Sequence, residues 1–456
     1  MLTDSRGIAV STTSTVALEA YETALTQFHS FHGDPLATID EALAADPEFV
    51  LGHLFKACVL STLSERRYLP LVVESTARAM ALESTATERE RRLIAATRLL
   101  ARGDWDRACR AFDEVLMVCP RDSLTIQTAH TLDFFRGDAL NLRNRTSRVL
   151  PHWSPQVPGY SYVLAMHAFG LEECNQYADA ESAGRRALDL DPRNGYAIHA
   201  VTHVMEMQGR IDEGIDFLES RVQDWAPDDA FAFHNWWHLA LFQLDRGRID
   251  EVLRLYDERI HPVPAQFLMP LVDATAMLWR LELEGVDVGN RWEAVAGTWL
   301  ERLNEERGHY AFNDFHAMLA FAASGHDEAL GRMVDDMAFT ARATSGSNPA
   351  MAREVGVALA DGVRAFAACR YGDAIEAIES VRDRAHRFGG SHAQRDVLTL
   401  TLVHAAMRSG DTARARHYLA ERTVHKPQSA WGWRLLDRTA RIDARADNRA
   451  VLARTA

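Results

Sequence analysis

Hydrophobic residues recur every three to four positions along nearly the whole chain, which has 456 residues. This spacing places apolar side chains on one face of an α-helix, and no segment shows the strict alternation of a half-buried β-strand. The helical stretches are about 12 to 18 residues long and end at Gly-Asp, Gly-Arg or Asp-Pro turns. The pattern therefore predicts an all-α protein built from short helices.

The turns between these helices recur at intervals of 34 to 47 residues. The series of turn residues is Gly103, Gly137, Asn175, Gly209, Gly247, Gly285, Gly325, Gly372 and Gly410. Similar phrases follow several of them, such as Arg-Ile-Asp-Glu at 210–213 and again at 248–251. A helix–turn–helix unit with a period near 34 is typical of tetratricopeptide repeats, which stack into an α-solenoid.

Two further repeat positions test this register once each turn residue is placed at position 15. Position 20, where two helices cross closely and the side chain must be small, falls on Ala108, Ala180, Ala377 and Ala415. Position 32, where a proline ends the second helix, falls on Pro120, Pro192, Pro264 and Pro427. These coincidences favour a true repeat over chance spacing.

The chain is predicted to form about ten to eleven helical hairpins in one tetratricopeptide-like superhelix. Residues 1–12 have no helical pattern and are expected to be disordered. Residues 13–150 are expected to form divergent hairpins, beginning with a shortened repeat at Gly33-Asp34-Pro35. Residues 151–440 are expected to form the more regular repeats, with a histidine-rich concave groove. The arginine-spaced tail at 441–456 is expected to continue a capping helix and then fray.

The chain is rich in histidine and poor in lysine. It has 19 histidines but two lysines, Lys56 and Lys426, and neither lies in a Gly-rich loop before a helix. Schiff-base and P-loop chemistry are therefore excluded. A net charge of -14 disfavours binding to nucleic acid or anionic membranes. Scattered cysteines, no apolar run that could span a membrane and no secretory signal favour a cytoplasmic protein.

Several histidines fall on the first helices of neighbouring hairpins, which line the concave face of such arrays. One repeat places His199 and His203 there, with Glu206 one turn further on. The next repeat places His234 and His238 there. Asn235 and Trp237 lie beside this second pair, and two repeats later Asp314 and His316 occupy a similar place.

Three interpretations of these histidines stay open. Residues four apart on a helix lie about 6 Å apart, so His199, His203, His234 and His238 could ligate Zn²⁺, Fe²⁺ or Mn²⁺ together. Alternatively, His203 and Glu206 could transfer protons as catalytic groups for a substrate in the groove. That substrate would be contacted by His199, His234, Asn235, Trp237, His238, Asp314 and His316. The third interpretation is ordinary packing and hydrogen bonding inside the repeats.

Four stretches resemble the tetratricopeptide repeat protein 38 family. They are YAIHAVTHVMEMQGR at 196–210, FHNWWHLAL at 233–241, FNDFHAM at 312–318 and GGSHAQRD at 389–396. The resemblance covers about residues 160 to 435 and implies a soluble, all-helical repeat protein. It implies no reaction, because none is established for the family as a whole.

The last of these stretches contains a predicted helix start. Ser391 is expected to cap a helix whose first turns contain His392 and Arg395. A helix N-terminus beside an arginine could bind a carboxylate or phosphate ligand. The alternative is a capped helix with a structural Arg395–Asp396 pair.

The sequence thus favours a repeat protein that binds, and could transform, a small organic molecule in a groove lined by His, Trp and Glu. A metal-dependent enzyme that uses the histidines, a peptide-binding adaptor and a purely structural scaffold are the alternatives. Whether the protein is an enzyme stays open, and so does its oligomeric state, a homodimer included. The scarcity of lysine counts against the adaptor, since peptide grooves of this kind commonly use Lys and Arg clamps.

Overall fold

A computed structural model describes residues 1–261 and 267–455, with side-chain environments up to Arg445. Pro264, one of the repeat-end prolines, lies outside the described residues. The first part of the chain contains α1 (Thr15–Ser30), α2 (Pro35–Ala45), α3 (Val50–Ser61), α4 (Leu69–Ala81), α5 (Glu88–Leu100), α6 (Trp105–Val118), α7 (Ser123–Phe135) and α8 (Ala139–Val149). Short 3-10 turns η1 (Arg66–Tyr68), η2 (Glu83–Thr85) and η3 (Leu150–His152) connect some of them.

The middle of the chain continues with helices of 4 to 16 residues. They are α9 (Tyr160–Glu173), α10 (Tyr177–Leu190), α11 (Gly195–Gln208), α12 (Ile211–Ser220), α13 (Val222–Trp225), α14 (Ala232–Asp245), α15 (Ile249–Leu255), α16 (Leu268–Leu283), α17 (Arg291–Glu306), α18 (Ala311–Ser324) and α19 (Asp327–Thr340). One turn of π-helix, η4 (Tyr256–Ile260), extends α15.

The last part completes the array. It contains α20 (Ser347–Met351), the π-turn η5 (Ala352–Gly356), α21 (Val357–Ala367), α22 (Tyr371–Glu379), the 3-10 segment η6 (Arg382–Phe388), α23 (His392–Ser409), α24 (Thr412–His425) and α25 (Ala430–Thr455). Consecutive helices pair as hairpins from α1/α2 to α23/α24. The predicted all-α, tetratricopeptide-like solenoid is confirmed.

The turn residues of the repeats adopt the left-handed conformation that stops one helix and starts the next. Gly209 has φ +71° and Asn175 has φ +60°, a region that glycine and asparagine enter most easily. One predicted turn residue is wrong: Gly372 lies inside α22, and Cys369 is the left-handed residue, with φ +56°. Cysteine is not typical of a left-handed turn, so the sequence pattern pointed to the glycine three residues later.

Small residues lie where paired helices cross. Ala108, Ala180 and Ala415 are fully buried, as position 20 requires. The error at Gly372 shifted this position too, because the buried alanine of that hairpin is Ala374 and not Ala377. Close packing of this kind joins successive hairpins through one large core cluster and two small ones, of which one contains Ala180.

The N-terminal residues are ordered, contrary to the expectation for 1–12. Strands β1 (Leu2–Thr3) and β2 (Ala9–Val10) form an antiparallel hairpin. Val10 is fully buried, and Arg89 of α5 forms an ion pair with buried Asp4. A two-residue strand is too short to show periodicity, so this contact to α5 could not be read from the sequence.

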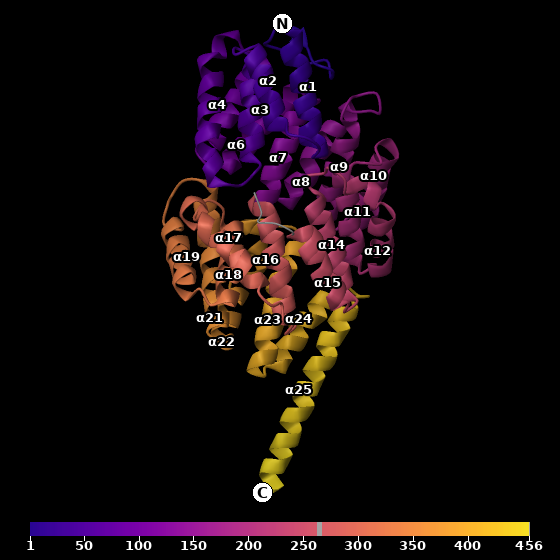
Figure 1. The fold of residues 1–456 in the computed structure, drawn as a ribbon, viewed down its shortest axis with the longest axis vertical. Helices are drawn as coiled ribbons and strands as arrows, with labels where there is room; N and C mark the ends of the chain where they lie inside the picture. The colour runs from indigo at the N-terminus through magenta and orange to yellow at the C-terminus, as the bar shows by residue number, and fades with distance from the viewer. Residues whose placement is uncertain (262–266, 456) are drawn as a thin grey trace.

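The superhelix closes on itself, and the expected concave groove is filled. In Figure 1 the hairpin α23/α24 lies below the central helix α16. Helix α23 contacts α11 and α16. The indigo N-terminal part also reaches the later repeats, because the Leu268 N–H donates to Glu65 Oε1 at 2.9 Å. The inner faces of the first helices are therefore packed against protein.

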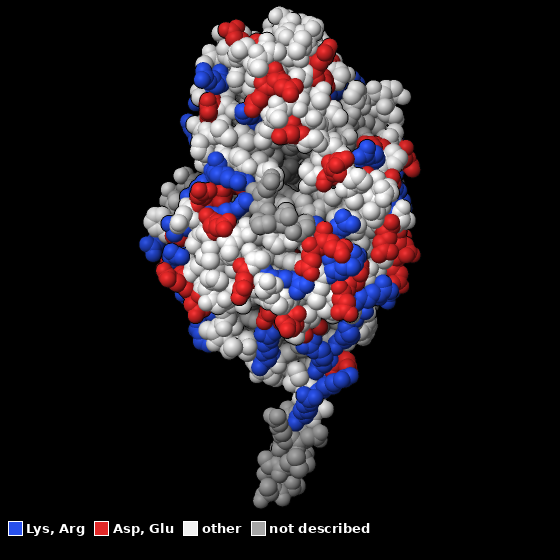
Figure 2. Space-filling model, viewed as in Figure 1, with Lys and Arg blue, Asp and Glu red and all other residues white. Residues whose placement is uncertain are grey.

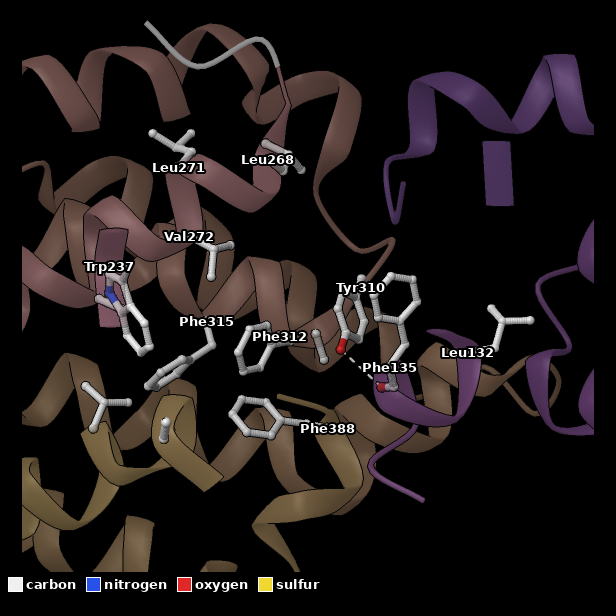
Figure 3. Packing of buried hydrophobic residues seen from close by; sticks show 14 of the residues in the cluster. Leu132, Phe135, Trp237, Leu268, Leu271, Val272, Tyr310, Phe312, Phe315 and Phe388 are labelled. Carbon is white, nitrogen blue, oxygen red and sulfur yellow. Dashed lines mark hydrogen bonds between the residues drawn. The ribbon is translucent and has the colours of Figure 1, made fainter. Parts of the chain in front are cut away.

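Aromatic side chains from distant repeats fill part of this interior. Figure 3 shows Phe135 of α7, Phe312 and Phe315 of α18 and Phe388 of η6 around Tyr310. The Tyr310 hydroxyl donates to the Phe135 carbonyl oxygen at 3.1 Å. This contact ties α7 to the start of α18.

The C-terminal helix α25 leaves the body of the molecule. It continues to Thr455, so residues 441–455, expected to fray, are helical in the structure (Figure 1). Positive and negative side chains are interspersed over the face seen in Figure 2. No helix in the described parts of the chain is both long enough and apolar enough to cross a lipid bilayer.

Candidate functional site

The structure brings four of the predicted histidines together. His199 and His203 lie one turn apart on α11, and His234 and His238 lie one turn apart on the adjacent α14. Ring centroids of His199 and His203 are 4.4 Å apart, and those of His203 and His238 are 4.5 Å apart. One nitrogen from each of the four rings lies within 4.8 Å of the other three. We call these residues the four-histidine cluster.

Two of these rings are held by carboxylates. His234 Nδ1 lies 2.6 Å from Asp273 Oδ2, and Asp273 comes from α16. His238 Nδ1 lies 2.7 Å from Glu206 Oε2. A hydrogen bond from Nδ1–H to a carboxylate fixes the ring orientation and makes Nε2 the free lone pair, as in metal-ligating histidines.

The buried nitrogens that remain have no hydrogen-bond partner among the described residues. They are Nε2 of His238 and both ring nitrogens of His199 and His203. Buried polar atoms are nearly always hydrogen-bonded, and leaving one unpaired costs about 1–3 kcal/mol. Several such atoms that face one another therefore indicate a site that binds a ligand.

Burial keeps His199 and His238 neutral. It lowers the pKa of His238 to about 3, and burial together with the neighbouring imidazoles lowers that of His199 well below its usual range. His203 differs: burial opposes its charged form, but the carboxylate of Glu172 prevails and raises its pKa. Neutral imidazole is the form that binds metal ions.

Glu206 is ionised and held in place. Burial opposes its charge, but the ammonium of Lys426 and the N–H of His238 keep the pKa of Glu206 well below its usual range. Lys426 Nζ lies 2.9 Å from Glu206 Oε1. A carboxylate bound on both oxygens is a poor proton acceptor, so the geometry gives Glu206 an orienting role instead of the acid–base role considered from sequence.

A shell of aromatic rings surrounds the cluster. Phe169 lies 5.2 Å from the rings of both His199 and His203, and Phe231 lies 5.1 Å from His199. Trp237 stacks on His234 with ring planes 9° apart. The four histidines are between 0% and 5% exposed. The cluster is therefore enclosed.

Trp237 and Asn235, which were predicted to contact a ligand, lie in the packed interior and contact other parts of the protein. Trp237 is fully buried, and the guanidinium of Arg280 lies 5.3 Å from its ring. Asn235 is also fully buried and donates to the Gly195 carbonyl at 3.3 Å. Both side chains are therefore enclosed by protein.

Asp314 and His316 do not join the cluster. Both carboxylate oxygens of Asp314 accept from the Gly308 N–H at 3.1 Å. His316 Nδ1 donates to the Phe312 carbonyl within its own helix. Among the described residues, no hydrogen bond or ring contact connects either side chain with the four histidines. Matching repeat positions two hairpins apart did not bring them close.

The predicted anion site at the start of α23 is occupied by the protein itself. Ser391 caps the helix as predicted. The His392 N–H donates to Glu173 Oε1 at 2.8 Å, and Arg395 donates to Glu173 Oε2 at 3.1 Å. The proposed Arg395–Asp396 pair is absent, because Asp396 accepts from Arg422. The helix N-terminus thus holds the last residue of α9.

Three residues at the cluster were missed from the sequence: Glu172, Asp273 and Lys426. Glu172 is fully buried, and neither carboxylate oxygen has a hydrogen-bond partner in the described structure. It precedes the turn of its hairpin, as Glu206 does in the next, and this repeat position was an available signal. Asp273 and Lys426 come from helices outside the two histidine repeats and could not be assigned.

No family model matches the chain. Among solved structures, the chain resembles the Cut9–Hcn1 hetero-tetramer of APC/C, with 14% identity over 93% of this chain and 76% of that chain and a TM-score of 0.45. It resembles a human IFIT1 dimer with m7Gppp-AAAA (12% identity, 93% and 94% coverage, TM-score 0.43). It also resembles yeast Tom70 (12% identity, 96% and 98% coverage, TM-score 0.34). At this level of likeness, the site itself must indicate the function.

Proposed function

We propose that the chain is a helical-repeat protein that binds a divalent transition-metal ion through the four-histidine cluster. The main support is the set of ring nitrogens that face one another without partners, while Asp273 and Glu206 fix the rings of His234 and His238. Ligand nitrogens lie about 2.0–2.1 Å from Zn²⁺, so the rings would turn slightly inward on binding. The broad torsional freedom of histidine rings permits this adjustment.

Imidazole ligands narrow the choice of metal. Four nitrogen donors suit Zn²⁺ and Fe²⁺, whereas Mn²⁺ prefers carboxylate and water oxygens. Among the ions expected from the sequence, Zn²⁺ and Fe²⁺ therefore fit the cluster better. A site with four protein ligands is typical of a structural metal ion.

Buried carboxylates surround the cluster. Four of them lie next to the histidine rings or to their partners: Glu172, Glu173, Glu206 and Asp273. Carboxylates that contact the outer nitrogens of histidine rings are common around metal ions, because they fix the orientation of the ligands.

A small organic ligand fits the cluster less well. The rings are separated by contacts of 4.4 to 5.2 Å and are covered by aromatic side chains, so an organic molecule would have to displace the core. A peptide groove would need the inner helix faces to be exposed.

We also propose membership of the tetratricopeptide repeat protein 38 family, since residues 196–210 and 233–241 are the segments that contain the cluster.

Elemental analysis of purified, Zn²⁺-loaded protein tests the proposal. His238→Ala should lose one equivalent of metal relative to the unsubstituted protein. His316→Ala is the matched control, because His316 is equally buried and is also on an inner helix, but it should keep the full metal content. An unsubstituted protein that stays metal-free after incubation with Zn²⁺ or Fe²⁺, or a His238→Ala protein with unchanged content, would contradict the proposal.

A further inference from the structure

The geometry points to a second divalent cation, bound between Glu172, Glu173 and His203. His203 would bridge the two ions as an imidazolate, with one ion on each ring nitrogen, and would release its remaining N–H proton to solvent as the metal binds. The inference rests on the proposed four-histidine centre, because His203 belongs to both sets of ligands. One donor atom from each of Glu172, Glu173 and His203 lies within 4.8 Å of the other two. All three side chains are at least nine-tenths buried.

The contact between His203 and Glu172 differs from the other histidine–carboxylate contacts of the cluster. His203 Nδ1 lies 3.4 Å from Glu172 Oε2, and neither atom forms a hydrogen bond in the described structure. Charge-assisted hydrogen bonds are about 2.7–2.9 Å long, as seen for His238 and Glu206 at 2.7 Å. Two ligands of one tetrahedral ion with bonds of about 2.1 Å are about 3.4 Å apart. The spacing fits two ligands better than a donor and an acceptor.

Glu172 gives the second indication. Both of its carboxylate oxygens are buried and accept no hydrogen bond from the described residues. The His203 ring is its printed ion-pair contact, with Nδ1 at 3.4 Å from Oε2. A buried carboxylate that accepts no hydrogen bond is costly to a fold. A cation at Glu172 removes that cost.

One ion cannot take both sets of ligands. Two ligands of the same ion are at most about 4.2 Å apart when each bond is about 2.1 Å. Glu172 forms a close group with Glu173 and His203 but not with the complete four-histidine cluster. An ion on each nitrogen of His203 would place the two metals about 6 Å apart, since each bond is about 2.1 Å and the ring separates its nitrogens by about 2 Å.

The two sites differ in chemistry. Glu173 accepts from the His392 N–H and from Arg395, yet each carboxylate oxygen has a second lone pair for a metal ion. Two carboxylates and one imidazole form a harder, oxygen-rich set than four imidazoles. The second site therefore suits Mn²⁺ or Fe²⁺ as well as Zn²⁺, with water molecules completing its coordination.

The stoichiometry of Zn²⁺ binding to the metal-stripped full chain tests this inference. We expect two equivalents in the unsubstituted protein and one in Glu172→Gln, which keeps the size of the side chain. Glu284→Gln is the matched control, because Glu284 also lies beside a buried histidine, at 3.2 Å from His404 Nε2, but outside both clusters. It should keep two equivalents.

Each other outcome has a distinct meaning. One equivalent in both the unsubstituted protein and Glu172→Gln overturns the second ion and leaves the four-histidine centre intact. Two equivalents in both show that Glu172 is not a ligand and also overturn it. No metal in the unsubstituted protein defeats the four-histidine proposal and this one with it.

A second measurement avoids dependence on the variant, in case Glu172→Gln fails to fold. The unsubstituted protein is titrated with Cu²⁺ and followed by electron paramagnetic resonance. Two copper ions bridged by one imidazole couple their spins, so the integrated signal should rise to one equivalent and then fall towards two. A signal that rises in proportion up to two equivalents, or that stops at one, overturns the bridge at His203.

Discussion

The Lys426→Met substitution tests how much the ion pair between Lys426 and Glu206 contributes to the stability of the protein. Lys426 Nζ lies 2.9 Å from Glu206 Oε1 and 3.7 Å from Asp396 Oδ2, and the lysine is 7% exposed. At an effective dielectric constant of 20, the attraction at 2.9 Å is about 6 kcal/mol. Desolvation offsets part of it, and removing one partner of a buried pair typically costs about 3–5 kcal/mol. His238 still donates to Glu206, so we expect a loss of about 3 kcal/mol.

Lys56, the other lysine of the chain, is the control. Its Nζ lies 2.6 Å from Asp40 Oδ1 on the surface, with an Asp40 side chain that is 54% exposed. Exposed pairs contribute about 0–1 kcal/mol. Urea unfolding followed by circular dichroism should therefore show a much larger midpoint shift for Lys426→Met than for Lys56→Met. Equal shifts below about 1 kcal/mol would refute the reasoning, because they would mean that the buried pair contributes nothing net.

Three further predictions concern other parts of the molecule. Burial lowers the pKa of His29 to about 4. The stability that neutral His29 permits above pH 6.5 is therefore lost as pH falls towards 4, by up to about 3 kcal/mol. The His29→Asn substitution should flatten the pH dependence of the urea midpoint over that range. Gly389→Ala should cost about 3 kcal/mol, because φ is +95° and the new Cβ would lie 1.9 Å from the Tyr310 hydroxyl. Gly285→Ala should cost only about 1 kcal/mol, since its Cβ would meet no atom within 4 Å; equal costs would contradict the steric cause. Zn²⁺ at one hundred times its dissociation constant should stabilise the unsubstituted protein by about 3 kcal/mol in thermal unfolding, but not His238→Ala.

The repeat architecture could be predicted because it is local. A left-handed turn needs glycine or asparagine, and a close helix crossing needs alanine, so residues such as Gly209 and Ala180 mark the period directly in the sequence. Elements whose sequence lacks such a marker residue could not be predicted correctly. Cys369 replaces the expected glycine, and the strand pair near Val10 is too short to be periodic.

The site was predictable only within its own repeats. The i, i+4 histidines of α11 and α14 were found because helix geometry places them on one face. Their partners come from far along the chain: Lys426 is 220 residues from Glu206, and Arg395 is 222 residues from Glu173. These contacts depend on how tightly the superhelix coils, and no residue pattern specifies its curvature. The predicted concave groove is filled for the same reason.

The most direct test of the four-histidine centre is an anomalous difference map from crystals of the Zn²⁺-loaded protein. We predict a zinc peak on α11 and α14, about 2.0–2.1 Å from one nitrogen of each of His199, His203, His234 and His238. Asp273 and Glu206 should remain hydrogen-bonded to the outer nitrogens of His234 and His238. A map with no peak among these four rings, or with zinc only at surface residues, would contradict the proposed function.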